Sequence, residues 1–128
     1  MSGLRSRNKG KRGEREVVNA FRESGFNADR LAPVQAGLST EYPDVKVFLK
    51  SCFDLSKEPW KLDFLIESKL MEITPNFHKI FAEYLALDAV VHRKNHQDQY
   101  ITMRLDRFIR LLKWAGVTTY GKESNGES

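Results

Sequence analysis

Two runs that are typical of β-strands, residues 44–49 and 61–69, constrain the fold of this 128-residue chain most strongly. Side chains of an extended strand alternate between its two faces, so Glu67 and Lys69 point to the same face. If the two runs lie side by side in one sheet, Asp44 at the start of the first approaches Glu67. The pattern therefore predicts two carboxylates and one ammonium group at a single point of a sheet.

Two carboxylates and a lysine in this arrangement are the functional groups needed for metal-dependent cleavage of a phosphodiester. Asp44 and Glu67, helped by the backbone carbonyl of Ser68, supply the all-oxygen ligand set that Mg²⁺ prefers. We expect Mg²⁺ as the cofactor, with Mn²⁺ able to substitute. An ordinary ion pair between Glu67 and Lys69 is the structural alternative.

Three other acids compete with Asp44 for the second position. Asp54 and Glu58 lie in the segment between the two strands. Asp63 shares the strand face of Glu67 but lies about 13 Å away along the strand, too far to share one ion. Asp44, preceded by a proline at a strand start, is the preferred candidate.

Pro43-Asp44, Glu67-Ser68-Lys69 and a glutamate on a preceding helix, Glu14, together resemble the PD-(D/E)xK nuclease superfamily. Within it, the pattern is similar to the archaeal-type Holliday-junction resolvases. The similarity continues through Gly25-Phe26 and Arg30. The chain departs from the family at residues 50–60, where a long insertion replaces the usual short turn.

The resemblance implies a restriction-endonuclease-like α/β fold, with a mixed central sheet flanked by helices in the order α-β-β-β-α-β-β-α. The helix of Glu14 is expected from Gly13 to Ser24, because Glu14, Val17, Val18 and Phe21 share one face. Glu16 lies away from that face and is expected to stay in solvent. Residues 27–33 are expected to be extended. Later elements are a helix starting at Thr74-Pro75, whose apolar stripe through Tyr84 is expected in the core, strands over 89–93 and 99–105, and a helix capped by Asp106 that runs through Trp114.

The resemblance also implies roles for the site residues in hydrolysis of DNA that leaves 5′-phosphate ends. Glu14 would complete the metal site through water, and Lys69 would orient or help deprotonate the attacking water. A glutamate in a first helical turn also complements the helix dipole, so a purely structural role for Glu14 stays open.

Basic residues predict where DNA is contacted. Residues 1–12 contain no acid and read as a flexible basic arm, or alternatively as a solvated tail. Arg30 either contacts the scissile phosphate or pairs with a nearby acid, and Ser39 lies in a loop expected to meet DNA. The basic residues of the arm that we expect to bind phosphates are Arg5, Arg7, Lys9, Lys11 and Arg12. Further candidates for a phosphate-binding surface are Arg93, Lys94, Arg104, Arg107, Arg110 and Lys113.

Composition agrees with one nuclease domain over residues 13–116, followed by a disordered tail over 117–128. The net charge of +4 favours a polyanionic partner. The single cysteine, Cys52, fits a reducing compartment, so the cytoplasm is the expected location. No stretch reaches the roughly 20 apolar residues that span a bilayer, and no membrane association is expected.

The sequence therefore predicts a Mg²⁺-dependent, structure-specific endonuclease that resolves four-way junctions by paired symmetric cuts. The resemblance also implies a homodimer, because a two-fold dimer matches a two-fold substrate. Its interface could be supplied by Phe53, Trp60 and Trp114, which could equally belong to the core. Two alternatives stay open: a related nuclease acting on flaps, nicks or linear ends, and a non-catalytic DNA-binding module of the same fold.

Overall fold

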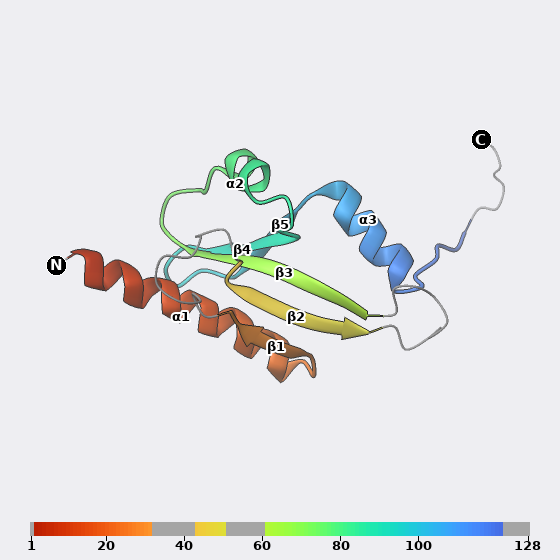
Figure 1. Cartoon of the computed structure of the whole chain (residues 1–128), viewed down its shortest axis with the longest axis horizontal. Helices are drawn as coiled ribbons and strands as arrows, with labels where there is room; N and C mark the ends of the chain where they lie inside the picture. Colours follow the sequence, from red (N-terminus) through yellow and green to blue (C-terminus); the bar gives the residue numbers. More distant parts are fainter. Residues whose placement is uncertain (1, 32–42, 51–60, 122–128) are drawn as a thin grey trace.

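The computed structural model describes residues 2–31, 43–50 and 61–121, with side chains from residue 11 onward. The helices and strands follow the predicted order α-β-β-β-α-β-β-α (Figure 1). They are α1 (Ser2–Glu23), β1 (Asn27–Arg30), β2 (Val45–Lys50), β3 (Lys61–Leu70), α2 (Phe77–Glu83), β4 (Ala89–Arg93), β5 (Tyr100–Met103) and α3 (Leu105–Trp114).

The strands form one five-stranded sheet in the order β1-β2-β3-β4-β5. β3 and β4 are parallel and are joined through α2, whereas each of the other neighbouring pairs is antiparallel. The predicted mixed sheet is confirmed, and its arrangement fits the restriction-endonuclease-like fold.

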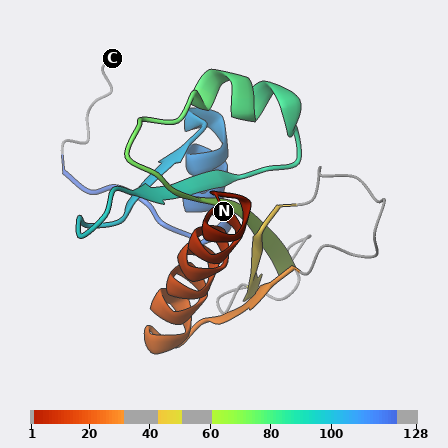
Figure 2. The ribbon, with the colours of Figure 1, turned by 90° about the vertical axis from the view of Figure 1, so that its left-hand side faces the viewer.

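The helices cover both faces of the sheet. α1 lies against one face, where it contacts β1, β2 and β3, and α2 and α3 lie on the other side (Figure 2). The core between α1 and the sheet consists mainly of branched apolar side chains. It includes Val17 and Val18 from α1, Val45 and Val47 from β2, and Ile66 from β3. The predicted inward face of the first helix is thus confirmed for both valines.

The predicted start of the first helix was wrong. α1 begins at Ser2 and runs through most of the segment expected to be a flexible arm. Arginine and lysine are good helix formers and no proline interrupts residues 2–12, so the helix extends outward from its packed half. Whether this basic segment moves as an arm on its own stays a prediction.

Two other helix starts also differ from expectation. α2 begins at Phe77 because the side chain of Asn76 caps it, accepting a hydrogen bond from the Lys79 backbone N–H at 3.1 Å. α3 begins at Leu105, so Asp106 lies in its first turn and is not its cap. There its negative charge complements the helix dipole.

The predicted end of the last helix is confirmed, whereas the disordered tail over 117–128 stays a prediction. α3 ends at Trp114, and Gly116 follows with a positive φ of 78°. Residues 117–121 form no helix or strand, and residues 122–128 lie outside the described part. Within the described ranges, no helix is long and apolar enough to cross a membrane.

Candidate active site

The register of β2 against β3 brings Asp44 opposite Glu67. Val45 pairs with Ile66, and one residue earlier the Asp44 N–H donates to the Ile66 carbonyl at 3.0 Å. The Ser68 N–H in turn donates to Asp44 Oδ2 at 2.8 Å. These bonds anchor the Asp44 carboxylate beside the Glu-Ser-Lys segment. The expected pairing of the two strands is confirmed.

Glu67 and Lys69 lie together on β3, as their spacing predicts. Lys69 Nζ is 3.4 Å from Glu67 Oε2, and the Glu67 side chain is the more buried of the two. This contact is equally expected for an ordinary ion pair and for a catalytic pair. The choice between them depends on what surrounds Glu67.

Asp44 has an unusual electrostatic environment. Burial raises its pKa from 3.8 to about 7, and the negative charges of Glu67 and Glu14 act in the same direction. The hydrogen bond from Ser68 and the charge of Lys69 oppose this shift. The site thus holds more negative charge than its lysine balances, which is the condition that a bound cation would relieve.

A close approach of α1 to β3 places Glu14 near these groups. A Cβ added at Gly13 would meet Ser68 Oγ at 2.9 Å and Leu70 Cβ at 3.3 Å. Only glycine allows the helix to lie this close. Glu14 follows directly and faces Arg30, whose Nε lies 3.2 Å from Glu14 Oε1. Of the two expectations for Arg30, pairing with a nearby acid is the one found.

The donor set fits a hard divalent cation in chemical kind, since it consists of carboxylate oxygens in a region of uncompensated negative charge. In the described part of the chain, no three histidine, cysteine, aspartate or glutamate side chains are grouped closely enough to hold an ion together. Asp44 and Glu67 therefore form the candidate ligand pair, and Glu14 lies further out, held by Arg30.

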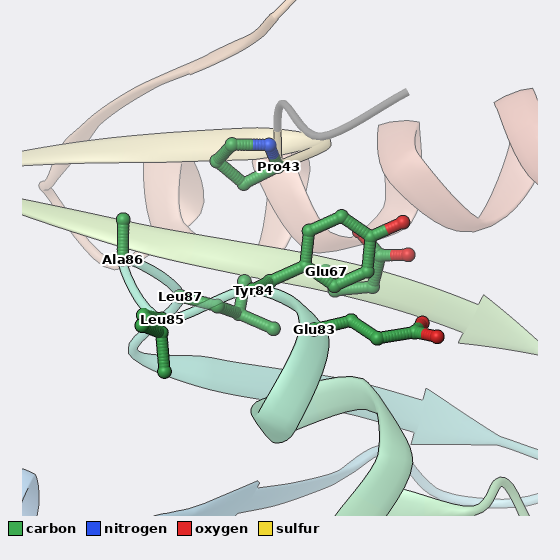
Figure 3. Close-up of a pocket in the computed structure, with 7 residues that line it drawn as sticks. All are labelled: Pro43, Glu67, Glu83, Tyr84, Leu85, Ala86 and Leu87. Atoms are coloured by element: carbon green, nitrogen blue, oxygen red, sulfur yellow. The ribbon is translucent and has the colours of Figure 1, made fainter. Parts of the chain in front are cut away.

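A small pocket of ≈ 130 Å³ opens beside Glu67 (Figure 3). Its walls are Pro43, Glu67, and residues 83–87 at the end of α2 and in the segment after it. Sequence reasoning placed Tyr84 in the apolar core stripe of that helix and missed this position. A tyrosine at the end of an otherwise apolar stripe, with a hydroxyl that needs a polar surrounding, was the available signal.

The residues predicted to bind DNA are only partly described. Arg5, Arg7 and Lys9 lie in the first turns of α1, and Ser39 lies outside the described residues. Lys11 and Arg12 are exposed on α1.

Three of the later basic residues, Arg93, Arg104 and Arg107, make hydrogen bonds within the fold. Arg93 donates two 2.7 Å hydrogen bonds to Glu16, and Arg107 donates a 2.6 Å bond to Asp88. Arg104 donates to backbone carbonyls of α2 and the segment after it. The expectation that Glu16 stays in solvent was wrong, because Arg93 reaches it from β4.

A mixed sheet of this order, with an aspartate and an E-x-K segment meeting beside an N-terminal helix, has the arrangement of the PD-(D/E)xK nuclease superfamily. A family model described as archaeal Holliday junction resolvase (hjc) matches residues 5–58. This stretch contains Glu14, Arg30 and Asp44 and ends before Glu67. The resemblance to archaeal-type Holliday-junction resolvases is thereby confirmed.

Among solved structures, the chain is similar to Hjc from Archaeoglobus fulgidus, a Holliday junction resolvase from an archaeal hyperthermophile. The two are 19% identical, with a TM-score of 0.45, over 73% of this chain and 76% of the other. No curated protein matches.

Proposed function

We propose that this protein is a Mg²⁺-dependent endonuclease that cuts branched DNA, with four-way junctions as its preferred substrate. The main support for this proposal is that Asp44, Glu67 and Lys69 lie together at the start of β2. The negative charge of Glu14 also acts on Asp44. The similarity to archaeal Holliday-junction resolvases supports the choice of substrate.

In this proposal Asp44, Glu67 and the Ser68 carbonyl would hold one or two Mg²⁺ ions, for which Mn²⁺ would substitute, and Glu14 would assist through water. The bound ion would supply positive charge that stabilises the phosphorane-like transition state and the leaving oxygen. The Ser68 N–H would keep the Asp44 carboxylate in position throughout, since it already donates to Oδ2.

Lys69 would act on the attacking water. Its Nζ, 3.4 Å from Glu67, would orient the water oxygen toward phosphorus or, as the neutral amine, accept the water's proton. As the new P–O bond forms, the bond to the 3′ oxygen breaks, which leaves a 5′-phosphate and a 3′-hydroxyl. The positive charge of Lys69 would also offset the neighbouring acids.

DNA would be held by positive charge on the same side of the molecule. α1 extends beyond the sheet at its N-terminal end, and this end carries the basic residues of the segment 1–12 (Figure 1). Arg30 is paired with Glu14 but 39% exposed, and in this proposal its exposed part would also contact the scissile phosphate. Such contacts would give binding that weakens steeply with salt.

Paired symmetric cuts would require two copies of the site. We propose a homodimer, supported by apolar side chains that α3 leaves exposed: Leu105 at 72%, and Phe108 and Ile109 at 43% each. Of the earlier interface candidates, Phe53 and Trp60 lie outside the described residues, and Trp114 is the last residue of α3. The cytoplasm stays the proposed location, on the strength of the single cysteine.

A substrate panel tests this function. A labelled four-way junction would be incubated with Mg²⁺ beside a flap, a nicked duplex and a linear duplex of the same sequence. We expect paired, symmetric incisions in the junction and much slower cutting of the others. Equal or faster cutting of flaps, nicks or ends would assign the alternative nuclease activity. Tight, salt-dependent binding without cutting would assign the non-catalytic module.

A further inference from the structure

We propose that a second pocket, at the carboxyl ends of β3 and β4, binds a nucleotide close to the scissile phosphate, with its base against Tyr100 and its phosphate at Lys94. This inference rests on the proposed function, because it takes the phosphate cut at Glu67 as its reference point. The pocket measures ≈ 290 Å³. It lies between Met71 and residues 73–75, which follow β3, residues 92–94 at the end of β4, and Gln97 and Tyr100.

The sheet places this pocket next to the candidate active site. β3 and β4 are parallel, and Lys69 pairs with His92 in their register. Paired residues of neighbouring strands point to the same face and lie about 4.8 Å apart. Phosphates along one DNA strand rise by about 3.4 Å per nucleotide. A strand with its scissile phosphate at Lys69 would therefore reach the pocket within about one or two nucleotides.

An exposed aromatic ring forms one wall of the pocket. Tyr100 is 63% exposed and lies nearly parallel to His92, with ring centroids 6.2 Å apart and an interplanar angle of 30°. His92 is itself fixed, since Nε2 lies 2.9 Å from Thr102 Oγ1 and Phe77 contacts its ring at 4.8 Å. A fixed ring behind an exposed one is a suitable platform for an unpaired base.

The charge of the lining complements a phosphate. The residues that line it include Arg93 and Lys94 and no acid, and the acid beside the lining, Glu72, accepts a 2.7 Å hydrogen bond from the Asn95 N–H. Arg93 is neutralised by Glu16, which accepts two 2.7 Å bonds from it, so Lys94 supplies the available positive charge. The exposed amide of Gln97 adds donors and an acceptor for a base edge. Aromatic and cationic groups together point to a nucleotide more than to an apolar ligand.

Binding measurements without divalent metal test this site, because no cutting then interferes. The affinity of wild-type protein would be compared for an intact junction and for junctions with one abasic nucleotide, moved stepwise around the exchange point. We expect one or two abasic positions to weaken binding about tenfold, within the range that base stacking on an aromatic ring contributes. The Tyr100→Ala variant should bind the intact junction about tenfold more weakly and should not respond to those abasic positions.

Matched variants separate the base contact from folding and from general charge. Tyr100→Phe keeps the ring and should bind like the wild type, as should Tyr120→Ala, which removes a tyrosine that is 102% exposed and outside the pocket. Lys94→Ala should reduce the slope of log affinity against log salt by about one.

Additive effects of Tyr100→Ala and the abasic nucleotide would overturn the inference, as would equal losses for Tyr100→Ala and Tyr120→Ala. These readouts need no cleavage. A wild-type protein that shows the coupling but cuts no DNA would refute the proposed nuclease function and leave the nucleotide site standing. A protein that cuts junctions without the coupling would refute the nucleotide site alone.

Discussion

Asp44 illustrates at the scale of one residue how a proposed catalytic position reduces stability. Its pKa of about 7 in the folded protein lies above its ordinary 3.8, so ionisation favours the unfolded chain. This penalty is absent below pH 3.8, grows as the pH rises toward 7 and is constant above it. A neutral residue of the same shape would remove it.

We therefore expect Asp44→Asn to be more stable than the wild type at pH 8 by about 1–3 kcal/mol. The advantage should shrink steadily as the pH falls toward 4. Thermal melts over a pH series without divalent metal measure this. A gain that is largest at pH 4, or no gain at pH 8, would contradict the account of Asp44. Added Mg²⁺ should raise the melting temperature of the wild type more than that of the variant.

Gly13 is a second residue whose role lies in packing. Gly13→Ala should destabilise the protein by about 1 kcal/mol or more, although alanine is the better helix former, because its Cβ would meet Ser68 Oγ at 2.9 Å. Urea unfolding measures the change. Asn19→Ala, an exposed position of the same helix, is the control and should be neutral or stabilising. A Gly13→Ala variant that is more stable than the wild type would show that α1 does not pack closely against β3.

The sequence predicted part of the site and missed part of it, for physical reasons. Strand alternation determines that Glu67 and Lys69 share a face, so that contact was predictable. Gly13 was taken as a helix start, since only the packed structure reveals that β3 lies against its Cα. Tyr84 was assigned to the core because its helical spacing matches apolar neighbours, and spacing does not distinguish a core ring from one beside Glu67.

At the scale of elements, one ion pair joins α1 to β4. The hydrogen bond from Arg93 lowers the pKa of Glu16 below its ordinary 4.5. The pair therefore contributes stability above pH 4.5, and this contribution is lost as the pH falls through the lowered pKa.

Glu16→Gln should accordingly lower the free energy of unfolding at pH 7 by about 1 kcal/mol. The difference from the wild type should narrow below pH 4.5. Unfolding in urea at pH 7 and at pH 3 would measure it. Glu23→Gln, exposed on the same helix, serves as the control. Equal effects of both variants on the free energy of unfolding would mean that the loss comes from the charge of the helix and not from the ion pair with Arg93.

The element boundaries show where sequence patterns are informative. The strand 89–93 was predicted to the residue, because apolar runs bounded by polar turns define their own ends. Helix starts were less predictable. Thr74-Pro75 predicted the start of α2, but the helix begins after its cap, Asn76. The basic segment before Gly13 has no apolar face, yet it continues α1 toward the N-terminus.

At the scale of the whole molecule, the proposed dimer is testable through α3. Phe108→Glu would place a charge among the exposed apolar side chains of that helix and should shift a dimer toward monomer by at least about tenfold in dissociation constant. Sedimentation at several concentrations measures this, with Arg110→Glu on the same helix as the control. A monomeric wild type, or an unchanged dimer in Phe108→Glu, would exclude this surface as the interface.

The proposed function requires that Asp44 and Glu67 form a metal-dependent cutting site for branched DNA. Its most direct test is the rate of four-way junction cleavage as Mg²⁺ is titrated, for the wild type, Asp44→Asn and Glu67→Gln. We predict cleavage by the wild type that requires the ion and a loss of at least about 100-fold in each folded variant. Cleavage that persists in either variant at the wild-type rate, or that proceeds equally in a metal chelator, would contradict the claim.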